Sequence, residues 1–426
     1  MKKIVKKGIL LFYPWRDALG IIIGGIPFRL GELWTLVIGL NYFVGGRRKL
    51  KKSEAALVLI LVINFLLTLL GVLFSYASID HSFATKYLFR NLIFSISIFA
   101  FLSSNMEFDK DDVEKLMYYT VFLQMIFFVV FYMTGYYMFM NQFSQKLNIY
   151  EQGQIVRIGG LMIRRFKGTA SESGYLAPFL SITLYYFINI FFDKENKKRR
   201  DKKKLMGLIC IIIMSLFTFS SAVYVIQAVT TFVALKRNGV KGKIMLVFTM
   251  VLGIVVIIAG LLFVPTISNF IRTDFADKIS TYLGLNSKNF SYSAVDRMQH
   301  IRNAWDMFIH GNLLEMLFGH GTGAYLVYSR RSAVMVNEVE EAYNLYLSTL
   351  TDRGLLGLVL LFLLFLFIRK HRIRGDKNSE TIYWGIFCQC IHWLITGNLW
   401  QYFFFYEIML LIGYKRNIYN RKVLAQ

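Results

Sequence analysis

The sequence predicts an all-α polytopic membrane protein with about 12 transmembrane helices. Three observations lead to this fold class. Hydrophobic residues make up 56% and charged residues only 18% of the 426 residues, which excludes a mainly soluble enzyme. The apolar residues lie in runs long enough to cross a bilayer. The cations lie in short clusters between those runs, as in the cytoplasmic loops of membrane proteins.

Each predicted span is an apolar run of roughly 17–25 residues with its flanks. Arg16 and Asp17 interrupt the first span and Arg90 interrupts the fourth. Charges in such places are expensive and normally face a cavity or a partner, and an Asp17–Arg90 pair would satisfy two of them. In chain order the spans are 8–27, 31–47, 55–76, 87–104, 115–137, 173–192, 205–219, 221–235, 244–266, 354–369, 381–396 and 399–413.

The net charge of +23 reflects topology in our interpretation. No basic region resembles a nucleic-acid-binding module, so nucleic acid is not an expected partner. The layout of spans places 32 of the 49 Lys and Arg residues in segments that the positive-inside rule assigns to the cytoplasm. We therefore expect a multi-pass protein of the plasma (inner) membrane with both termini cytoplasmic. Those segments are 1–7, 46–54, 105–116, 193–204, 236–243, 369–379 and 414–426.

The N-terminus and the cysteines add two smaller expectations. Residues 1–7 resemble the start of a signal peptide, but no small-residue cleavage site follows, so we expect a retained first span. Cys210, Cys388 and Cys390 all lie in apolar segments and are interpreted as small buried hydrophobic residues. Their spacing favours neither a metal site nor a redox motif.

The spans divide the chain into five regions, two of which are long extracytoplasmic loops. Outside loops longer than about 15 residues are usually functional or structured, so we expect the function in these two. The second loop shows helical spacing of apolar residues from Met298 to Ile309. The regions are N-terminal transmembrane helices (1–137), a first extracytoplasmic loop (138–172), central transmembrane helices (173–266), a large extracytoplasmic loop (267–353), and C-terminal transmembrane helices with a basic cytoplasmic tail (354–426).

The first loop ends in a cluster of cations. Arg157, Arg164, Arg165 and Lys167 precede small and hydroxyl residues. Guanidinium groups match phosphate oxygens, so this cluster is suited to a phosphate or pyrophosphate. The alternative is that these side chains reach lipid headgroups. Glu172 follows and would cap the next helix or act as a base.

The second loop carries two cations, two histidines and a glycine run. Arg297 and Arg302 lie about one and a half helical turns apart and do not share a face closely. The run Gly319-x-Gly321-x-Gly323 permits a tight backbone path or close approach of a ligand, but lacks the context of a dinucleotide motif. His300 and His320 lack zinc-site spacing, and we interpret them as solvated.

The end of the second loop is acidic. Glu340 and Glu341 precede the next span, and Arg353 lies at its mouth. Carboxylates clustered near a membrane surface can have the raised pKa that a general base needs. The alternative is a solvated acidic turn ahead of the span.

The order of these elements is similar to that of the O-antigen and capsular polysaccharide polymerase (Wzy) and O-antigen ligase (WaaL) superfamily. The resemblance in topology covers nearly the whole chain, and the motifs cover 157–357. They are Arg-x-x-Gly-Thr…Glu (Arg165 to Glu172), a Thr/Ser-rich turn (Thr218 to Ala222), an Arg…Trp helix (Arg297 to Trp305), Phe-Gly-x-Gly-x-Gly (Phe318 to Gly323), and Asn-x-x-Leu…Asp-Arg-Gly-Leu-Leu-Gly (Asn344 to Gly357).

The resemblance implies a GT-C-like glycosyltransferase that works on the extracytoplasmic face with polyprenyl-diphosphate-linked oligosaccharides and needs neither metal nor cofactor. The growing glycan would be transferred onto an incoming lipid-linked repeat unit, and a chain-length regulator and a flippase would be partners. Ligases of the superfamily usually have His-Asn where this chain has Tyr343-Asn344, which favours a polymerase. The alternatives are an O-antigen ligase acting on lipid A core, or a flippase for lipid-linked sugars.

The chemistry of the residues agrees with such a transfer. A carboxylate must orient or deprotonate the acceptor hydroxyl, and the candidates are Glu341 or Glu340, then Glu172. Cations must stabilise the leaving polyprenyl diphosphate in place of a metal ion. The candidates are Arg165, Arg297, Arg302 and Arg353, with Arg157 and Arg164 guiding the substrate.

Overall fold

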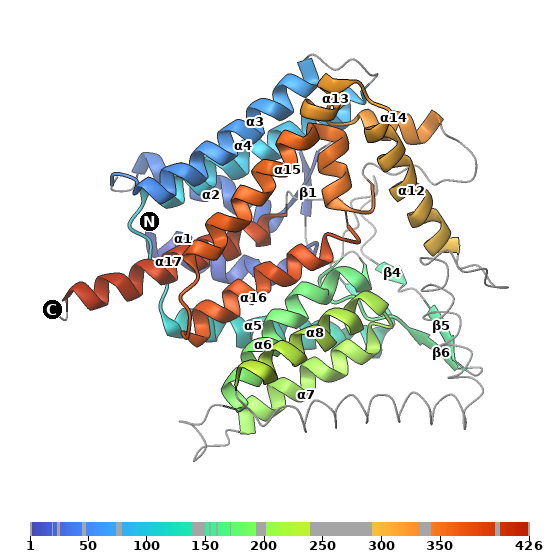
Figure 1. Ribbon diagram of the computed structural model, residues 1–426. Coiled ribbons are helices and arrows are strands. Elements are labelled where there is room, and N and C mark those ends of the chain that lie inside the picture. The colour runs from blue at the N-terminus through green and yellow to red at the C-terminus, as the bar shows by residue number, and fades with distance from the viewer. Residues whose placement is uncertain are drawn as a thin grey trace.

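The computed structural model is predominantly helical, with three short two-stranded antiparallel hairpins (Figure 1). It describes residues 2–18, 20–23, 26–44, 48–73, 79–138, 150–152, 155–158, 161–170, 172–192, 202–238, 292–331, 342–396 and 401–424. The predicted span 244–266 and the candidate bases Glu340 and Glu341 lie outside these residues.

The elements follow the predicted order of spans and loops, and the loops add strands that the sequence analysis did not predict. The N-terminal part holds α1 (Lys2–Phe12), the 3₁₀ turn η1 (Tyr13–Trp15), β1 (Gly20–Ile23), β2 (Ile26–Arg29), α2 (Leu30–Val44), α3 (Lys52–Leu73), α4 (His81–Ser103) and α5 (Lys110–Thr134). The next part holds β3 (Tyr136–Met138), β4 (Tyr150–Gln152), β5 (Ile155–Ile158), β6 (Leu161–Arg164), the 3₁₀ turn η2 (Ser173–Leu176), α6 (Ala177–Phe191), α7 (Lys202–Phe217) and α8 (Ser221–Arg237). The C-terminal part holds α12 (Tyr292–Ile309), α13 (Leu313–Phe318), α14 (Ala324–Arg331), α15 (Leu345–His371), α16 (Lys377–His392) and α17 (Tyr402–Leu424).

Several described helices are suited to a bilayer, which identifies a helical membrane protein. Five are long and apolar enough to cross it: α3, α4, α5, η2 continuing into α6, and α15. The number of twelve spans stays a prediction. The predicted amphipathic helix of the second loop is confirmed by α12.

The first predicted span, 8–27, is wrong as a single helix. α1 ends at Phe12, η1 follows, and β1 pairs with β2 from Gly20–Arg29 to Ile23–Ile26. Pro14 explains the break, because a proline cannot donate the backbone hydrogen bond that a continuing helix needs. The chain instead turns at Arg16 and Asp17, and both side chains are buried.

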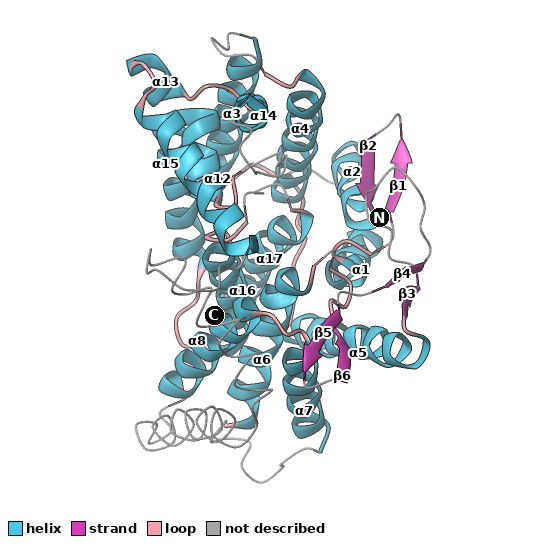
Figure 2. Cartoon of the chain, turned by 90° about the vertical axis from the view of Figure 1, so that its right-hand side faces the viewer, coloured by secondary structure: helices cyan, strands magenta, loops and turns pink. Residues whose placement is uncertain are grey.

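The helices form two groups with a shared centre. α3 packs on α4 and α15, and α4 packs on α2; α6 packs on α7, α8 and α16. Figure 2 shows the two groups above and below α16 and α17. Both termini lie on one side of the molecule, which we name the terminal side, whereas α12, α14, β4, β5 and β6 lie on the opposite side, the loop side (Figure 1).

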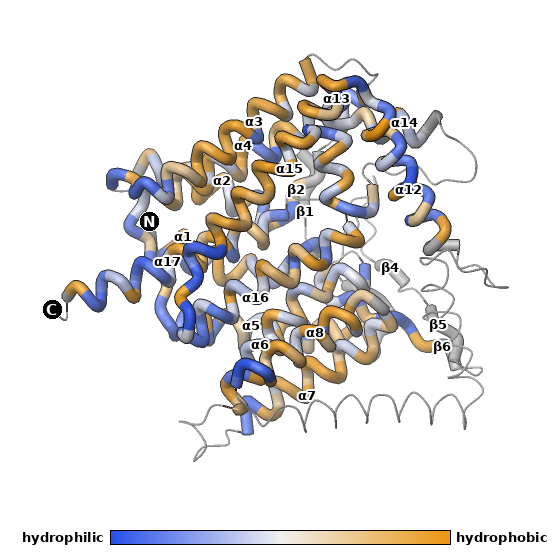
Figure 3. Tube along the Cα trace, in the orientation of Figure 1, coloured by the Kyte–Doolittle hydropathy of each residue, from blue (hydrophilic) through white to orange (hydrophobic). Residues whose placement is uncertain are grey.

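Buried ion pairs fasten the helix ends on the terminal side. Nη2 of Arg416 in α17 lies 2.9 Å from Oε1 of Glu54 in α3, and Nη2 of Arg48 lies 2.5 Å from the same oxygen. Glu380 in α16 pairs with Arg237 and with Nε of Arg372 at 2.6 Å. Figure 3 shows hydrophilic residues at these helix ends and apolar residues between them.

Glu54→Gln should lower the free energy of unfolding by about 3 kcal/mol, because it leaves the buried guanidinium of Arg416 without its carboxylate. Thermal unfolding of the purified protein in detergent measures this. Asp306→Asn on exposed α12 is the control and should change stability by less than about 0.5 kcal/mol. Equal loss in both variants would contradict the role of the buried pair.

The glycine run packs against a break in α15. The backbone of α15 is not helical at Gly354, whose φ is 62°. The backbone N–H groups of His320 and Gly321 donate to the carbonyls of Thr351 and Asp352 at 2.7 and 3.2 Å. A Cβ atom on Gly319 would lie 2.3 Å from the backbone N of Arg353. The run therefore provides the tight backbone path, one of the two roles expected from its sequence.

Candidate functional site

The site begins where the end of the first loop (138–172) meets the turn after α1. Gln124 of α5 joins the two: its Nε2 donates to the Pro14 carbonyl at 3.1 Å and to Thr169 Oγ1 at 2.7 Å. Thr169 Oγ1 also donates to the Pro14 carbonyl, and the backbone N–H of Asp17 donates to the Thr169 carbonyl at 2.9 Å. The Gly-Thr element of the first loop thus holds the turn that carries Arg16 and Asp17.

That turn starts a series of buried charges. Asp17 lies between two cations, with Oδ2 3.3 Å from Arg16 Nε and Oδ1 2.7 Å from Arg29 Nε. Glu32 lies 3.5 Å from both Arg29 Nη1 and Arg90 Nε. The charges that interrupt the first and fourth predicted spans therefore belong to one series. Among these described residues the expected Asp17–Arg90 pair is not formed, because Asp17 pairs with Arg16 and Arg29. Arg90 pairs with Glu32 instead.

The second loop (267–353) supplies a compact polar cluster. The guanidinium of Arg297 lies over the ring of Tyr343, 5.3 Å from its centroid, and Tyr343 is hydrogen-bonded to Asp296. The His300 ring lies 5.5 Å from the Tyr343 ring, and its Nδ1 is 2.7 Å from the Tyr325 hydroxyl. Both phenols are held among helices α12 and α14 and the turn before α15.

Burial governs the ionisation of these phenols. Burial first, and then the negative charge of Asp296, raises the pKa of Tyr343 above its ordinary value. Burial likewise raises the pKa of Tyr325. Both hydroxyls are therefore neutral at physiological pH and can donate a hydrogen bond.

The two long loops approach each other around Tyr175 at the start of η2. Glu172 and Arg297 both lie close enough to Tyr175 and to Tyr343 to interact with them electrostatically. The Tyr175 ring stacks edge-on against His392, and His392 Nε2 is 3.1 Å from the Gly174 carbonyl. A carboxylate and a cation from loops more than 120 residues apart in sequence thus share one place on the loop side.

The described arginines of the first loop bind backbone carbonyls at the ends of neighbouring helices. Nε of Arg165 donates to the Thr218 carbonyl at 3.2 Å, which joins the first loop to the Thr/Ser-rich turn between α7 and α8. Arg164 donates to the carbonyl of Gly135 at the end of α5. Arg157 lies in β5, and its side chain is outside the described residues.

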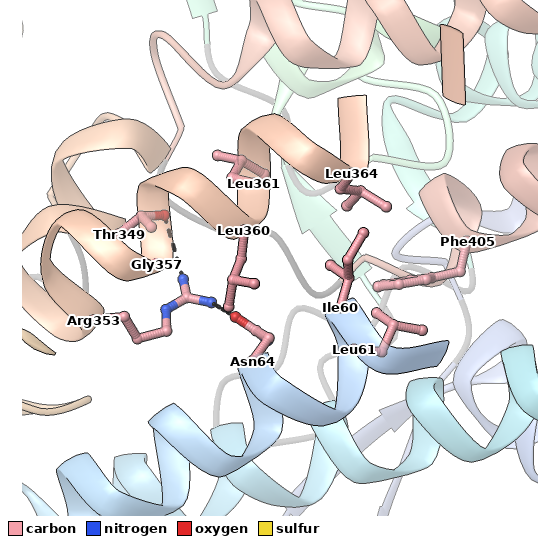
Figure 4. Close-up of a pocket in the computed structure, with 10 residues that line it drawn as sticks. All are labelled: Ile60, Leu61, Asn64, Thr349, Arg353, Gly357, Leu360, Leu361, Leu364 and Phe405. Atoms are coloured by element: carbon pink, nitrogen blue, oxygen red, sulfur yellow. Dashed lines mark hydrogen bonds between the residues drawn. The ribbon is translucent and has the colours of Figure 1, made fainter. Parts of the chain in front are cut away.

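The cations predicted in the second loop separate. Arg297 lies at the meeting point, and Arg302 is exposed further along α12. Arg353 is buried between α3, α4 and α15 (Figure 4). Its Nη1 donates to Asn64 Oδ1 at 2.6 Å, and it lines a cavity of about 20 Å³, which has room for one water. Arg353 is therefore held within the helices rather than beside Arg297.

The structure describes one of the three candidate carboxylates, Glu172. It is exposed and sits at the N-cap of η2, yet its side chain makes no capping hydrogen bond. Glu340 and Glu341 stay predictions. Asn344, from the neighbouring motif, caps α15: its Oδ1 accepts hydrogen bonds from the backbone N–H groups of Tyr346 and Leu347.

The expectation that His300 and His320 are solvated is wrong. His300 is 0% exposed and His320 is 8% exposed. Nε2 of His320 lies 2.9 Å from the Met307 carbonyl, and His300 contacts Tyr325. The reason is that α12 and α14 pack with the turn before α15 into a small core, which includes Ala304, Met307 and Tyr325.

The sequence analysis did not assign Arg16, Tyr175 or Tyr343 to the site. Arg16 had a signal, because a charge inside an apolar segment normally faces a cavity or partner. Tyr343 had one as well, because it stands where ligases of the superfamily have His, whereas nothing distinguished Tyr175 from the other tyrosines among the 25 in the chain. The chain matches no protein-family model and no curated protein, so its function rests on this geometry and on the motif resemblance.

Proposed function

We propose that the protein is a metal-independent glycosyltransferase of the plasma membrane that polymerises polyprenyl-diphosphate-linked oligosaccharide repeat units into O-antigen or capsular polysaccharide. One observation carries the proposal. The carboxylate of Glu172 comes from the first loop and the guanidinium of Arg297 from the second. Both interact electrostatically with Tyr175 and Tyr343 on the loop side of a membrane protein.

The reaction needs a base and a stabiliser of negative charge. A hydroxyl of the incoming repeat unit attacks the anomeric carbon of the growing chain, and the bond from that carbon to the diphosphate oxygen breaks. The hydroxyl proton passes to the Glu172 carboxylate, and the polyprenyl diphosphate leaves with the bonding electron pair. Arg297 stabilises the charge on that diphosphate as it develops.

The other described groups orient these two residues. Tyr343 packs under the Arg297 guanidinium and is held in place by its hydrogen bond with Asp296. Its hydroxyl donates its hydrogen to Asp296, and the hydroxyl oxygen can still accept a hydrogen bond from a sugar hydroxyl. Arg165, Arg157, Arg164, Arg302, Arg353, Glu340 and Glu341 stay candidates for the wider substrate path.

Deletion of the gene followed by gel analysis of surface polysaccharide tests the proposed function. We expect a product of one repeat unit, because assembly and export of the unit continue without polymerisation. Long chains that remain unattached to lipid A core would instead identify an O-antigen ligase. Loss of all surface sugar would identify a flippase.

Topology provides a second test. In a variant without the three native cysteines, Gln299→Cys on exposed α12 should react with a membrane-impermeant maleimide in spheroplasts. Arg421→Cys at the exposed end of α17 should react only after permeabilisation. The reverse pattern would place the candidate site in the cytosol, where no outward-facing substrate meets it.

A further inference from the structure

Arg16 is a buried cation with unmade hydrogen bonds beside the proposed reaction site. It is 1% exposed and follows η1 at the centre of the molecule. We propose that the Arg16 guanidinium forms the inner end of a binding site for a phosphate-bearing ligand, which under the proposed function is the diphosphate of the lipid carrier. Arg297 forms the outer end of the same site.

The hydrogen bonds of Arg16 are the first observation. Among the described residues, neither Nε nor Nη1 of Arg16 has a hydrogen-bond acceptor. These two nitrogens carry three of the five N–H groups of a guanidinium. The carboxylate of Asp17 lies 3.3 Å from Nε without accepting a hydrogen bond from it, and it also pairs with Arg29. Buried charged groups are expensive when their hydrogen bonds are unmade, so a phosphate oxygen is the partner that this guanidinium fits.

The charge around Arg16 is the second observation. The series Arg16, Asp17, Arg29, Glu32 and Arg90 contains three cations and two carboxylates. Among the described residues this series therefore has one more cation than carboxylates, and its members Arg16, Asp17 and Glu32 are buried. An anion at the Arg16 end of the series would neutralise that excess, whereas a neutral sugar would not.

The surroundings of Arg16 link it to Arg297. The guanidinium carbon lies 5.1, 5.7 and 4.8 Å from the ring centroids of Tyr175, Phe179 and Phe403. These rings attract the cation but offer its in-plane N–H groups no acceptor. Tyr175 contacts Arg16 and also interacts electrostatically with Arg297, so it is a described residue that links the two cations.

The two arginines match the two phosphates of a diphosphate. Both interact electrostatically with His392 as well as with Tyr175. A single phosphate would engage one arginine, while a diphosphate can engage both. Arg16 is a binding residue in this scheme and takes no part in proton transfer.

Thermal unfolding of the purified full-length protein in detergent tests the proposal. The probes are farnesyl diphosphate, inorganic pyrophosphate and phosphatidylglycerol. We expect farnesyl diphosphate to raise the unfolding temperature of the wild type. Arg16→Met should weaken that binding about tenfold or more, since a charge-assisted contact to a phosphate is lost. Without ligand, Arg16→Met should be at least as stable as the wild type, because it removes a charge whose hydrogen bonds are unmade.

Arg416→Met is the matched control on the terminal side. Arg416 is also buried, but its guanidinium donates to Glu54 and to the carbonyls of Leu102, Ser104 and Met106. This variant should unfold at a lower temperature and yet keep the full ligand-induced rise. Arg16→Lys keeps the charge and loses the planar fork, so it should bind several-fold more weakly and tests the site even if Arg16→Met does not fold.

The outcomes separate the inference from the proposed function. Farnesyl diphosphate that binds Arg16→Met and wild type equally would overturn the inference and leave the proposed function standing. A response to phosphatidylglycerol as large as that to farnesyl diphosphate would overturn the assignment to a diphosphate. A wild type that responds to neither diphosphate would remove both the inference and the proposed donor.

Discussion

Arg297→Gln should stop the surface polysaccharide at one repeat unit while the protein stays in the membrane at its normal level. Arg297 is half-buried over the ring of Tyr343 and interacts electrostatically with Tyr175, and under the proposed function its charge stabilises the leaving diphosphate. Removal of one such stabilising group lowers the rate of a reaction by about 10²- to 10³-fold. A gel of surface polysaccharide and an immunoblot of membranes measure both parts of the prediction.

Two further variants sharpen this test. Arg297→Lys keeps the charge but loses the bidentate fork, so it should give shorter and fewer chains rather than none. Arg421→Gln at the exposed end of α17 removes an equal charge on the terminal side and should leave the chain-length pattern unchanged. Wild-type chain lengths in Arg297→Gln would remove Arg297 from the reaction.

Gly319→Ala should lower the free energy of unfolding by more than about 3 kcal/mol, or prevent accumulation of folded protein. The backbone at Gly319 has a φ of 84°, which favours glycine. An added Cβ would also lie 2.3–2.4 Å from backbone atoms of Asp352 and Arg353. The backbone of α15 cannot move aside, because it is itself broken at Gly354 and packed on Leu317. Size-exclusion chromatography and thermal unfolding in detergent measure the result.

Gly375→Ala provides the matched control. Gly375 has nearly the same φ, 85°, but no atom of the described residues lies within 4 Å of the position that its Cβ would take. Only the conformational penalty applies there, which is about 1–2 kcal/mol. A Gly319→Ala variant no less stable than Gly375→Ala would show that the close approach to α15 contributes little.

The sequence predicted the long apolar helices well because hydrophobicity acts locally. The predicted segments 55–76 and 115–137 correspond to α3 and α5, and the helical pattern of the second loop corresponds to α12. The first span failed because apolar content alone does not record the break at Pro14. The three hairpins were missed because strands of three or four residues leave almost no periodic signal.

The site was predicted in part. The sequence named Glu172 and Arg297 separately, as a candidate base and a candidate diphosphate-binding residue, and in the fold both interact electrostatically with Tyr175 and Tyr343. The other contacts join residues far apart in the chain, and no local sequence pattern predicts them. Position 353 follows a long loop in sequence, but the fold buries Arg353 against Asn64 in α3. Arg16 belongs near the site only because Gln124 and Thr169 hold its turn there.

The aromatic neighbours of Arg16 have a consequence for biosynthesis. They come from η2, α6 and the last helix of the chain, where Phe403 lies near the start of α17. The ribosome makes Tyr175 and Phe179 before the middle of the chain but Phe403 only near its end, so Arg16 lacks its contact with the Phe403 ring until translation is nearly finished. Premature termination before residue 403 therefore yields a chain that can insert into the membrane but cannot complete the ring contacts around Arg16.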